Sequence, residues 1–263
     1  MIPKKIHYIW FGGNPLPPLA ERCIASWEKY MPGYEIVRWD ESNFDTDCCD
    51  YVREAISVKK WAFASDYARF KILYEHGGVY LDTDVELLKP LDEIIQRGPF
   101  MGFEQDFSSG AAGAVAPGLG LAANPGLGLA ANPGLGLAAN PGLGLYKTIL
   151  DSYESDHFIK TGGVYDQTTV VVRTTDILKG LGLEDKPGIQ EVAGITIYPS
   201  EYFCPKDFLT HEINVTENTY AIHHFDGSWA GPATHFKHKV MRAVGPRGVI
   251  LFKAFKNIIK GVR

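Results

Sequence analysis

Cysteine is scarce in this sequence, and its spacing gives no disulfide framework. The four cysteines are Cys23, Cys48, Cys49 and Cys204, and they lack the paired short spacings of a structural metal site. We therefore expect reduced thiols, as in a cytosolic enzyme. No uncharged apolar run reaches the ~18 residues that a membrane span needs, and the first residues lack a signal-peptide pattern, so we expect neither feature.

Apolar and aromatic residues, in contrast, are plentiful. They make up 45% and 12% of the 263 residues, which excludes disorder for most of the chain. This length and composition predict one domain with its own core.

Charge is unevenly distributed along the chain. Residues 237–263 hold eight basic residues and no acidic one. The remaining residues carry a net charge of −13, which gives the chain its overall net charge of −5. An acidic body repels nucleic acid, and we expect no nucleic-acid partner. Apolar residues interleaved with lysines over 249–263 predict an amphipathic helix that binds an anionic membrane surface. An ordinary surface helix is the alternative.

Short apolar runs alternate with longer segments of helical periodicity. Strands are predicted over 5–10, 35–39, 79–82, 85–88, 100–104, 194–198 and 220–225, and helices over 19–31, 59–76 and 176–182. This alternation predicts an α/β domain over residues 1–236, with a mostly parallel central sheet flanked by helices. In such sheets, ligands bind at the carboxyl ends of the strands.

One segment is a tandem repeat. The octapeptide GLGLAANP occurs three times over 118–141, and a partial copy fills 142–145. Its period is far below that of solenoid repeats. We interpret 118–145 as an insertion in a connection, with two copies duplicated. In the last full copy, Asn140 is the predicted N-cap of a helix and Pro141 its first residue.

A pair of aspartates ends the strand predicted over 79–82. Alternate residues of a strand face the same side, so Asp82 and Asp84 are expected to converge. Carboxylate oxygens at the ligand-binding edge suit Mg²⁺ or Mn²⁺, which takes substrate phosphates as further ligands. A solvated turn is the alternative for such a triplet.

Asp66 and Arg69 are three residues apart on the apolar helix predicted over 59–76. A charged pair on a mostly buried helix needs polar partners, which a polyhydroxyl ligand would supply. The alternative is an intrahelical ion pair.

A third polar cluster follows the last predicted strand. One imidazole of His223-His224 is a candidate third metal ligand, for which we take His224 although the spacing leaves His223 open. Ser228 and Trp229 are candidates for a lid over the ligand. The alternative is a core strand with one buried histidine.

These motifs together resemble a known family. The segment SDYARFKILYEHGGVYLDTDVELLKP, with HYIWFGG upstream and IHHFDGSW downstream, is similar to the DXD-containing sugar-binding glycosyltransferases of family 32. That family includes yeast α-1,6-mannosyltransferases and bacterial transferases of capsular or surface polysaccharide. The resemblance covers about residues 2–110 and 190–230. It implies a GT-A fold and transfer of a sugar from a nucleotide-sugar donor, with retention at the anomeric carbon.

The resemblance also implies roles for individual residues. Asp82 and Asp84 would hold Mn²⁺ or Mg²⁺ on the donor diphosphate. Asp66 and Arg69 would contact the sugar and phosphates of the donor, and with Asp84 they are the candidate catalytic residues. Trp10 would stack on the nucleobase.

The expected function is thus that of a metal-dependent retaining glycosyltransferase in polysaccharide biosynthesis. Its donor would be a UDP- or GDP-sugar, and its acceptor a glycan or glycolipid. We expect it in the cytoplasm, peripheral on the inner face of the cell membrane. The alternatives are a silent nucleotide-sugar-binding module and a nucleotide-sugar hydrolase.

Overall fold

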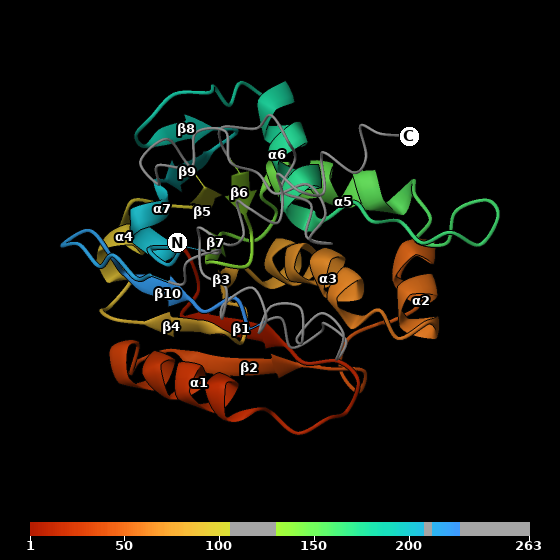
Figure 1. Cartoon of the computed structure of the whole chain (residues 1–263), viewed down its shortest axis with the longest axis horizontal. Coiled ribbons are helices and arrows are strands. Elements are labelled where there is room, and N and C mark those ends of the chain that lie inside the picture. Colours follow the sequence, from red (N-terminus) through yellow and green to blue (C-terminus); the bar gives the residue numbers. More distant parts are fainter. Residues whose placement is uncertain (106–129, 208–211, 227–263) are drawn as a thin grey trace, which may run out of the picture.

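The computed structural model describes residues 1–105, 130–207 and 212–226, which form a central sheet covered by helices (Figure 1). The strand order in the sheet is β2-β1-β3-β7-β5-β9-β8, and β6 pairs with β5. The strands are β1 (Lys5–Ile9), β2 (Glu35–Trp39), β3 (Gly78–Tyr80), β5 (Phe100–Gln105), β6 (Ala130–Asn132), β7 (Leu137–Ala139), β8 (Gln190–Val192) and β9 (Ile195–Tyr198).

The sheet is mixed but mainly parallel. Strands β2, β1, β3, β5 and β9 point the same way, whereas β6, β7 and β8 run against them. The predicted α/β class with a mainly parallel sheet is therefore confirmed.

Successive side chains of a strand point to opposite faces of the sheet and therefore pack into two separate hydrophobic cores. In β3, Val79 packs into one core and Tyr80 into the other, and both side chains are buried. One face carries α2 (Asp50–Ser57), α3 (Trp61–His76), α5 (Gly144–Glu154) and α6 (Val170–Gly180). The other carries α1 (Pro18–Tyr30), α4 (Asp92–Gln96), α7 (Ser200–Phe203) and a ribbon of β4 (Val85–Leu87) and β10 (Ala221–His223).

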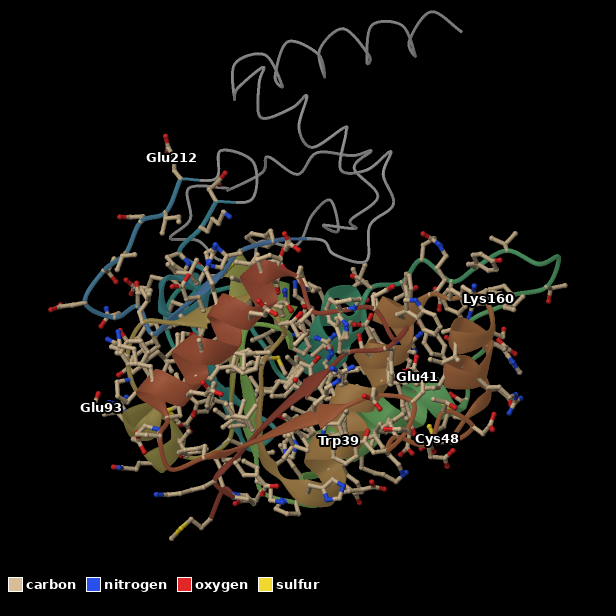
Figure 2. The ribbon with its side chains drawn as sticks, turned by 90° about the horizontal axis from the view of Figure 1, so that it is seen from below. Trp39, Glu41, Cys48, Glu93, Lys160 and Glu212 are labelled. Atoms are coloured by element: carbon tan, nitrogen blue, oxygen red, sulfur yellow. The ribbon has the colours of Figure 1, made fainter. Side chains whose placement is uncertain are left out.

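Many charged side chains lie on the outside of these layers. Figure 2 shows Glu93 and Glu212 at the edge of the view, and both are exposed. No helix within the described ranges is long and apolar enough to cross a bilayer.

Several element boundaries follow the sequence closely. Strand β2 has the predicted bounds, and α3 ends before Gly77, whose φ of +62° favours glycine. Two predictions were wrong: α6 begins at Val170 rather than near 176, and Asn140 and Pro141 do not begin α5, which starts at Gly144 with Leu143 as its N-cap. Helix α2 was not foreseen.

The repeat contributes to the sheet itself. Its second and third copies supply β6 and β7, and β7 lies between β3 and β5 in the middle of the sheet. Residues 118–129 and the whole tail 237–263 lie outside the described residues. The duplication, the domain boundary at 236 and the amphipathic tail helix therefore stay predictions.

Candidate active site

The aspartates of the DXD triplet lie in a turn between β3 and β4. The Val85 amide donates to the Asp82 carbonyl at 3.0 Å and closes this turn. The strand predicted over 79–82 ends earlier, at Tyr80, so the strand alternation expected to bring Asp82 and Asp84 to one side does not apply. Their carboxylates nevertheless converge, because the ligand atoms of Asp82, Asp84 and His223 all lie within 4.8 Å of one another.

This turn lies at the carboxyl end of β3, at the edge of the sheet where ligands were expected. Trp10 follows β1, which runs parallel to β3, and Glu104 lies near the end of β5, which points the same way. Three strand ends thus bring polar and aromatic side chains to one edge.

Asp84, which is partly buried, pairs with the buried His223. His223 Nε2 lies 3.3 Å from Asp84 Oδ1, and the Asp226 amide donates to Asp84 Oδ2 at 2.9 Å. Burial raises the pKa of Asp84, but the charge and hydrogen bond of His223 outweigh it and lower the pKa to about 2. Burial likewise lowers the pKa of His223, and Asp84 raises it well above its usual value.

His224 points to a different partner. Its Nε2 lies 2.8 Å from Glu86 Oε2, whereas His223 is the imidazole beside Asp82 and Asp84. Register explains the difference: His223 pairs with Val85 in the β10–β4 ribbon, and neighbouring residues of a strand face opposite sides.

Arg69 links α3 to the DXD turn. Its guanidinium donates to Asp66 Oδ1 at 2.9 Å and lies 3.4 Å from Asp82 Oδ2, and only 5% of its side chain is exposed. The Tyr80 hydroxyl donates to Asp82 Oδ1 at 2.8 Å and its ring lies under the guanidinium. The predicted pair of Asp66 and Arg69 is thus buried and joined to the metal-ligand candidate Asp82.

Asp66 is the carboxyl most strongly affected by its surroundings. Burial raises its pKa to about 7, against the opposing effect of Arg69 and of the Val170 amide at the start of α6. A carboxyl with such a pKa is a candidate hydrogen-bond partner for a sugar hydroxyl, since it exchanges between donor and acceptor near neutrality.

Trp10 lies at the same edge of the sheet, half-buried, with its indole N–H donating to the Asn14 carbonyl at 2.7 Å. Ser228 and Trp229 lie outside the described residues, so their predicted role as a lid stays a prediction.

Sequence reasoning missed three residues that reach the site. Burial raises the pKa of Glu104, which interacts with His223 and Asp84, and Asn132 Nδ2 donates to the Glu104 carboxyl. The Asp82 amide donates to the Gly134 carbonyl at 3.1 Å. Asn132 and Gly134 belong to the repeat, whose identical copies give no signal of which one lies at the site.

The residues present fit a divalent cation. Four carboxyl groups, those of Asp66, Asp82, Asp84 and Glu104, gather around two cationic groups, so a cation would offset excess negative charge. Asp82 and Asp84 supply the oxygen ligands that Mg²⁺ and Mn²⁺ prefer, and His223 would supply a third ligand atom after giving up its proton, because only the neutral imidazole binds a metal.

Comparison with known proteins gives the same indication. Residues 17–101 match the family model described as a glycosyltransferase sugar-binding region containing a DXD motif. The chain is 27% identical over 137 residues to subversion of eukaryotic traffic protein A of Legionella pneumophila, covering 42% of this chain and 21% of that protein. It is 29% identical over 111 residues to inositol phosphoceramide mannosyltransferase 1 of Schizosaccharomyces pombe, covering 38% and 33%.

This chain therefore spans a third or less of the length of these two relatives. A solved galactosyltransferase, LgtC, in complex with donor and acceptor sugar analogues, is 14% identical with a TM-score of 0.44, covering 91% of this chain and 94% of that one. The matched segment 17–101 includes α3 and the DXD turn. The resemblance found in the sequence is thus confirmed over residues 17–101, which are similar to the sugar-binding region of the DXD-containing glycosyltransferases.

Proposed function

We propose that this protein is a metal-dependent glycosyltransferase that moves a sugar from a nucleotide-sugar donor, with retention, to a glycan or glycolipid acceptor. The observation that carries the proposal is the convergence of Asp82, Asp84 and His223 beside the buried Arg69. Asp82, Asp84 and His223 supply candidate metal ligands, and Arg69 supplies a cationic group. Asp82, Asp84 and Arg69 lie within the residues that match the DXD sugar-binding region.

In this mechanism, the leaving group is a nucleoside diphosphate. Asp82, Asp84 and His223 would hold the metal, and the metal would neutralise charge that develops on the diphosphate. Burial lowers the pKa of Arg69, but Asp82 and Asp66 outweigh it and hold the pKa above its usual value, so the guanidinium stays cationic toward the phosphates. Asp66 would orient the sugar through its hydroxyls, and Trp10 would stack on the base.

A donor screen tests this proposal. The protein is incubated with UDP- and GDP-sugars in the presence of Mn²⁺, Mg²⁺ or EDTA, and nucleotide release is measured with and without glycan acceptors. We expect release with at least one donor, dependent on the metal and faster with an acceptor. Donor binding without turnover would show a silent module, and release that no acceptor accelerates would show a hydrolase.

The acceptor and location belong to the same proposal. We propose a cytoplasmic enzyme held on the anionic inner face of the membrane by the basic residues of 249–263, where it would act on a lipid-linked saccharide in polysaccharide biosynthesis. The name of the fission-yeast relative, which specifies a lipid acceptor, supports this choice. Sedimentation with phosphatidylserine vesicles is expected to fall when 249–263 is deleted; unchanged sedimentation contradicts the membrane role.

A further inference from the structure

The junction between the second and third copies of the repeat forms a turn against the DXD motif. Asn132-Pro133-Gly134 follows β6, and the Leu135 amide closes the turn on the Asn132 carbonyl at 3.4 Å. The Gly134 carbonyl accepts from the Asp82 amide at 3.1 Å. The backbone of the repeat therefore lies directly beside the first aspartate of the motif.

Gly134 leaves no room for a side chain. A Cβ at this position would lie 1.9 Å from Asp82 Oδ2 and 2.8 Å from its carboxyl carbon. The φ of Gly134 is not in the positive range that favours glycine, so steric space is the reason for glycine here. The carboxylate of Asp82 thus occupies the volume that any larger residue would take.

Asn132 fixes the turn through both ends of its amide. Its Oδ1 accepts from the Gly134 amide at 2.7 Å, its Nδ2 donates to Glu104, and the residue is 7% exposed. Both a donor and an acceptor are needed, so aspartate would not serve: it would lose the bond to Glu104 and add a carboxylate to an acidic cluster.

We propose that the turn Asn132–Gly134 is a positioning element that sets the Asp82 carboxylate for metal binding. The inference rests on the proposed metal-dependent function and extends it to the repeat. Asp82 Oδ2 is confined between the Gly134 backbone and Arg69, while Tyr80 holds Oδ1. A carboxylate confined in this way needs little reorganisation when a cation binds.

The next junction, between the third copy and the partial fourth, has the same tripeptide in different surroundings. Among the described residues, no atom beyond the chain neighbours of Gly142 lies within 4 Å of a Cβ built on it, and its φ is +76°. Asn140 Oδ1 is buried and has no hydrogen-bond partner among the described residues. Place in the fold, not sequence, therefore gives Asn132 and Gly134 their role, and the later copies supply matched controls.

The test compares Gly134→Ala with Gly144→Ala. Gly144 also belongs to the repeat, begins α5, has open space around a built Cβ and has no positive φ. Mn²⁺ affinity is measured by titration calorimetry, and the unfolding temperature is measured in EDTA. We expect Gly134→Ala to weaken Mn²⁺ binding about 10- to 100-fold, as loss of an outer-shell partner does, and Gly144→Ala to leave it unchanged.

A second pair of variants covers the case in which Gly134→Ala does not fold. Asn132→Ala removes the amide without adding bulk and is expected to weaken Mn²⁺ binding, whereas Asn140→Ala is expected to retain it. Wild-type affinity in Asn132→Ala, or in a folded Gly134→Ala, overturns the inference while wild-type turnover upholds the proposed function. A wild-type protein that neither binds Mn²⁺ nor releases nucleotide overturns the proposed function, and the inference with it.

Discussion

Two arginines in the described part of the chain lie between pairs of aspartates, one buried and one partly buried. Arg69 has 5% of its side chain exposed and lies between Asp66 and Asp82 at the DXD turn. Arg173 on α6 has 11% exposed and lies between Asp156 and Asp166. Each guanidinium also lies over a tyrosine ring. The two clusters therefore share a composition and differ in how their charges are balanced.

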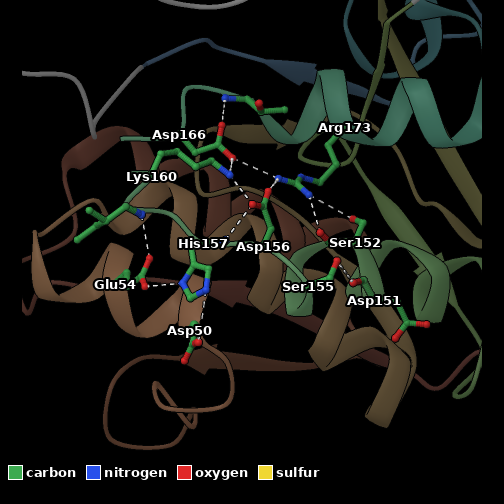
Figure 3. A network of polar contacts seen from close by, with 12 residues as sticks. Asp50, Glu54, Asp151, Ser152, Ser155, Asp156, His157, Lys160, Asp166 and Arg173 are labelled. Carbon is green, nitrogen blue, oxygen red and sulfur yellow. Dashed lines mark hydrogen bonds and ion pairs between the residues drawn. The ribbon is translucent and has the colours of Figure 1, made fainter. Parts of the chain in front are cut away.

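The cluster around Arg173 is closed by its own neighbours (Figure 3). Lys160 pairs with both carboxylates, the Thr168 amide donates to Asp166 Oδ1 at 2.8 Å, and the His157 amide donates to Asp156 Oδ1 at 2.9 Å. Burial raises the pKa of Asp156, but the hydrogen bonds from Arg173 and Lys160 outweigh it and hold the pKa at about 2.

Beside Arg69, the pKa of Asp66 shifts in the opposite direction. Burial dominates at Asp66 and raises its pKa to about 7, and Glu104 nearby also has a raised pKa. Protein groups thus pair with the carboxylates around Arg173, whereas at Asp66 burial outweighs the cationic groups among the described residues. The second condition is typical of a site that receives its counter-charge from a ligand.

The largest expected effect is at the DXD turn. Asp84→Asn removes a metal-ligand candidate and is expected to lower metal-dependent nucleotide release by on the order of 1000-fold, the rate equivalent of several kcal/mol of charge stabilisation. Asp166→Asn, in the other cluster, is the matched control and is expected to retain turnover. Equal rates in Asp84→Asn and wild type would refute the assignment of the metal site.

Removing Arg173 should affect stability rather than chemistry. Arg173→Met leaves Asp156 and Asp166 without their main partner, and we expect a loss of about 3–5 kcal/mol in the free energy of unfolding, measured with urea. Mn²⁺ affinity is expected to stay unchanged. Arg69→Met is the converse variant, expected to lose turnover through its contact with the donor phosphates. Loss of Mn²⁺ binding in a folded Arg173→Met variant would show that the Arg173 cluster also contributes to metal binding.

Replacement of Asp66 is expected to raise stability near neutral pH, whereas replacement of Arg173 is expected to lower it. The raised pKa of Asp66 means that its ionisation opposes folding, so the contribution of Asp66 to stability falls as pH rises from about 4 to about 7. Asp66→Asn removes this cost. In EDTA, the difference in free energy of unfolding should move in favour of the variant by roughly 1–4 kcal/mol between pH 4 and pH 8.

Turnover should fall in the same variant if Asp66 contacts the sugar. A variant that becomes less stable relative to wild type as pH rises would show that Asp66 is a satisfied structural carboxylate, like Asp156.

The parts of the site that the sequence predicted are those set by local geometry. Asp66 and Arg69 meet because residues three apart on a helix are neighbours, and the stop at Gly77 follows from a conformation that favours glycine. Asp82 and Asp84 were found, but in a turn, because β3 ends at Tyr80 and the chain reverses toward β4.

The parts that depend on distant pairing could not be predicted. The β10–β4 register decides which of two adjacent histidines faces Asp84. Strands β6 and β7 are built from alanine, leucine and asparagine of identical copies, a composition with weak strand preference and no mark of register. Only the pairing of β6 with β5, in which Asn132 lies opposite Gly102, shows which copy brings its asparagine to the site.

The smallest expected effect on stability distinguishes Asp156, in the Arg173 cluster, from Asp151, in an exposed ion pair. Since the folded-state pKa of Asp156 is lowered, its stabilisation is present above about pH 4 and disappears as pH falls toward 2. Asp156→Asn should therefore cost about 1 kcal/mol at pH 7, after allowance for solvent screening, and less at pH 3. Asp151→Asn breaks only an exposed pair with Lys147 and should change little at either pH. Equal, pH-independent losses in both variants would show that the Arg173 cluster is no more than surface charge.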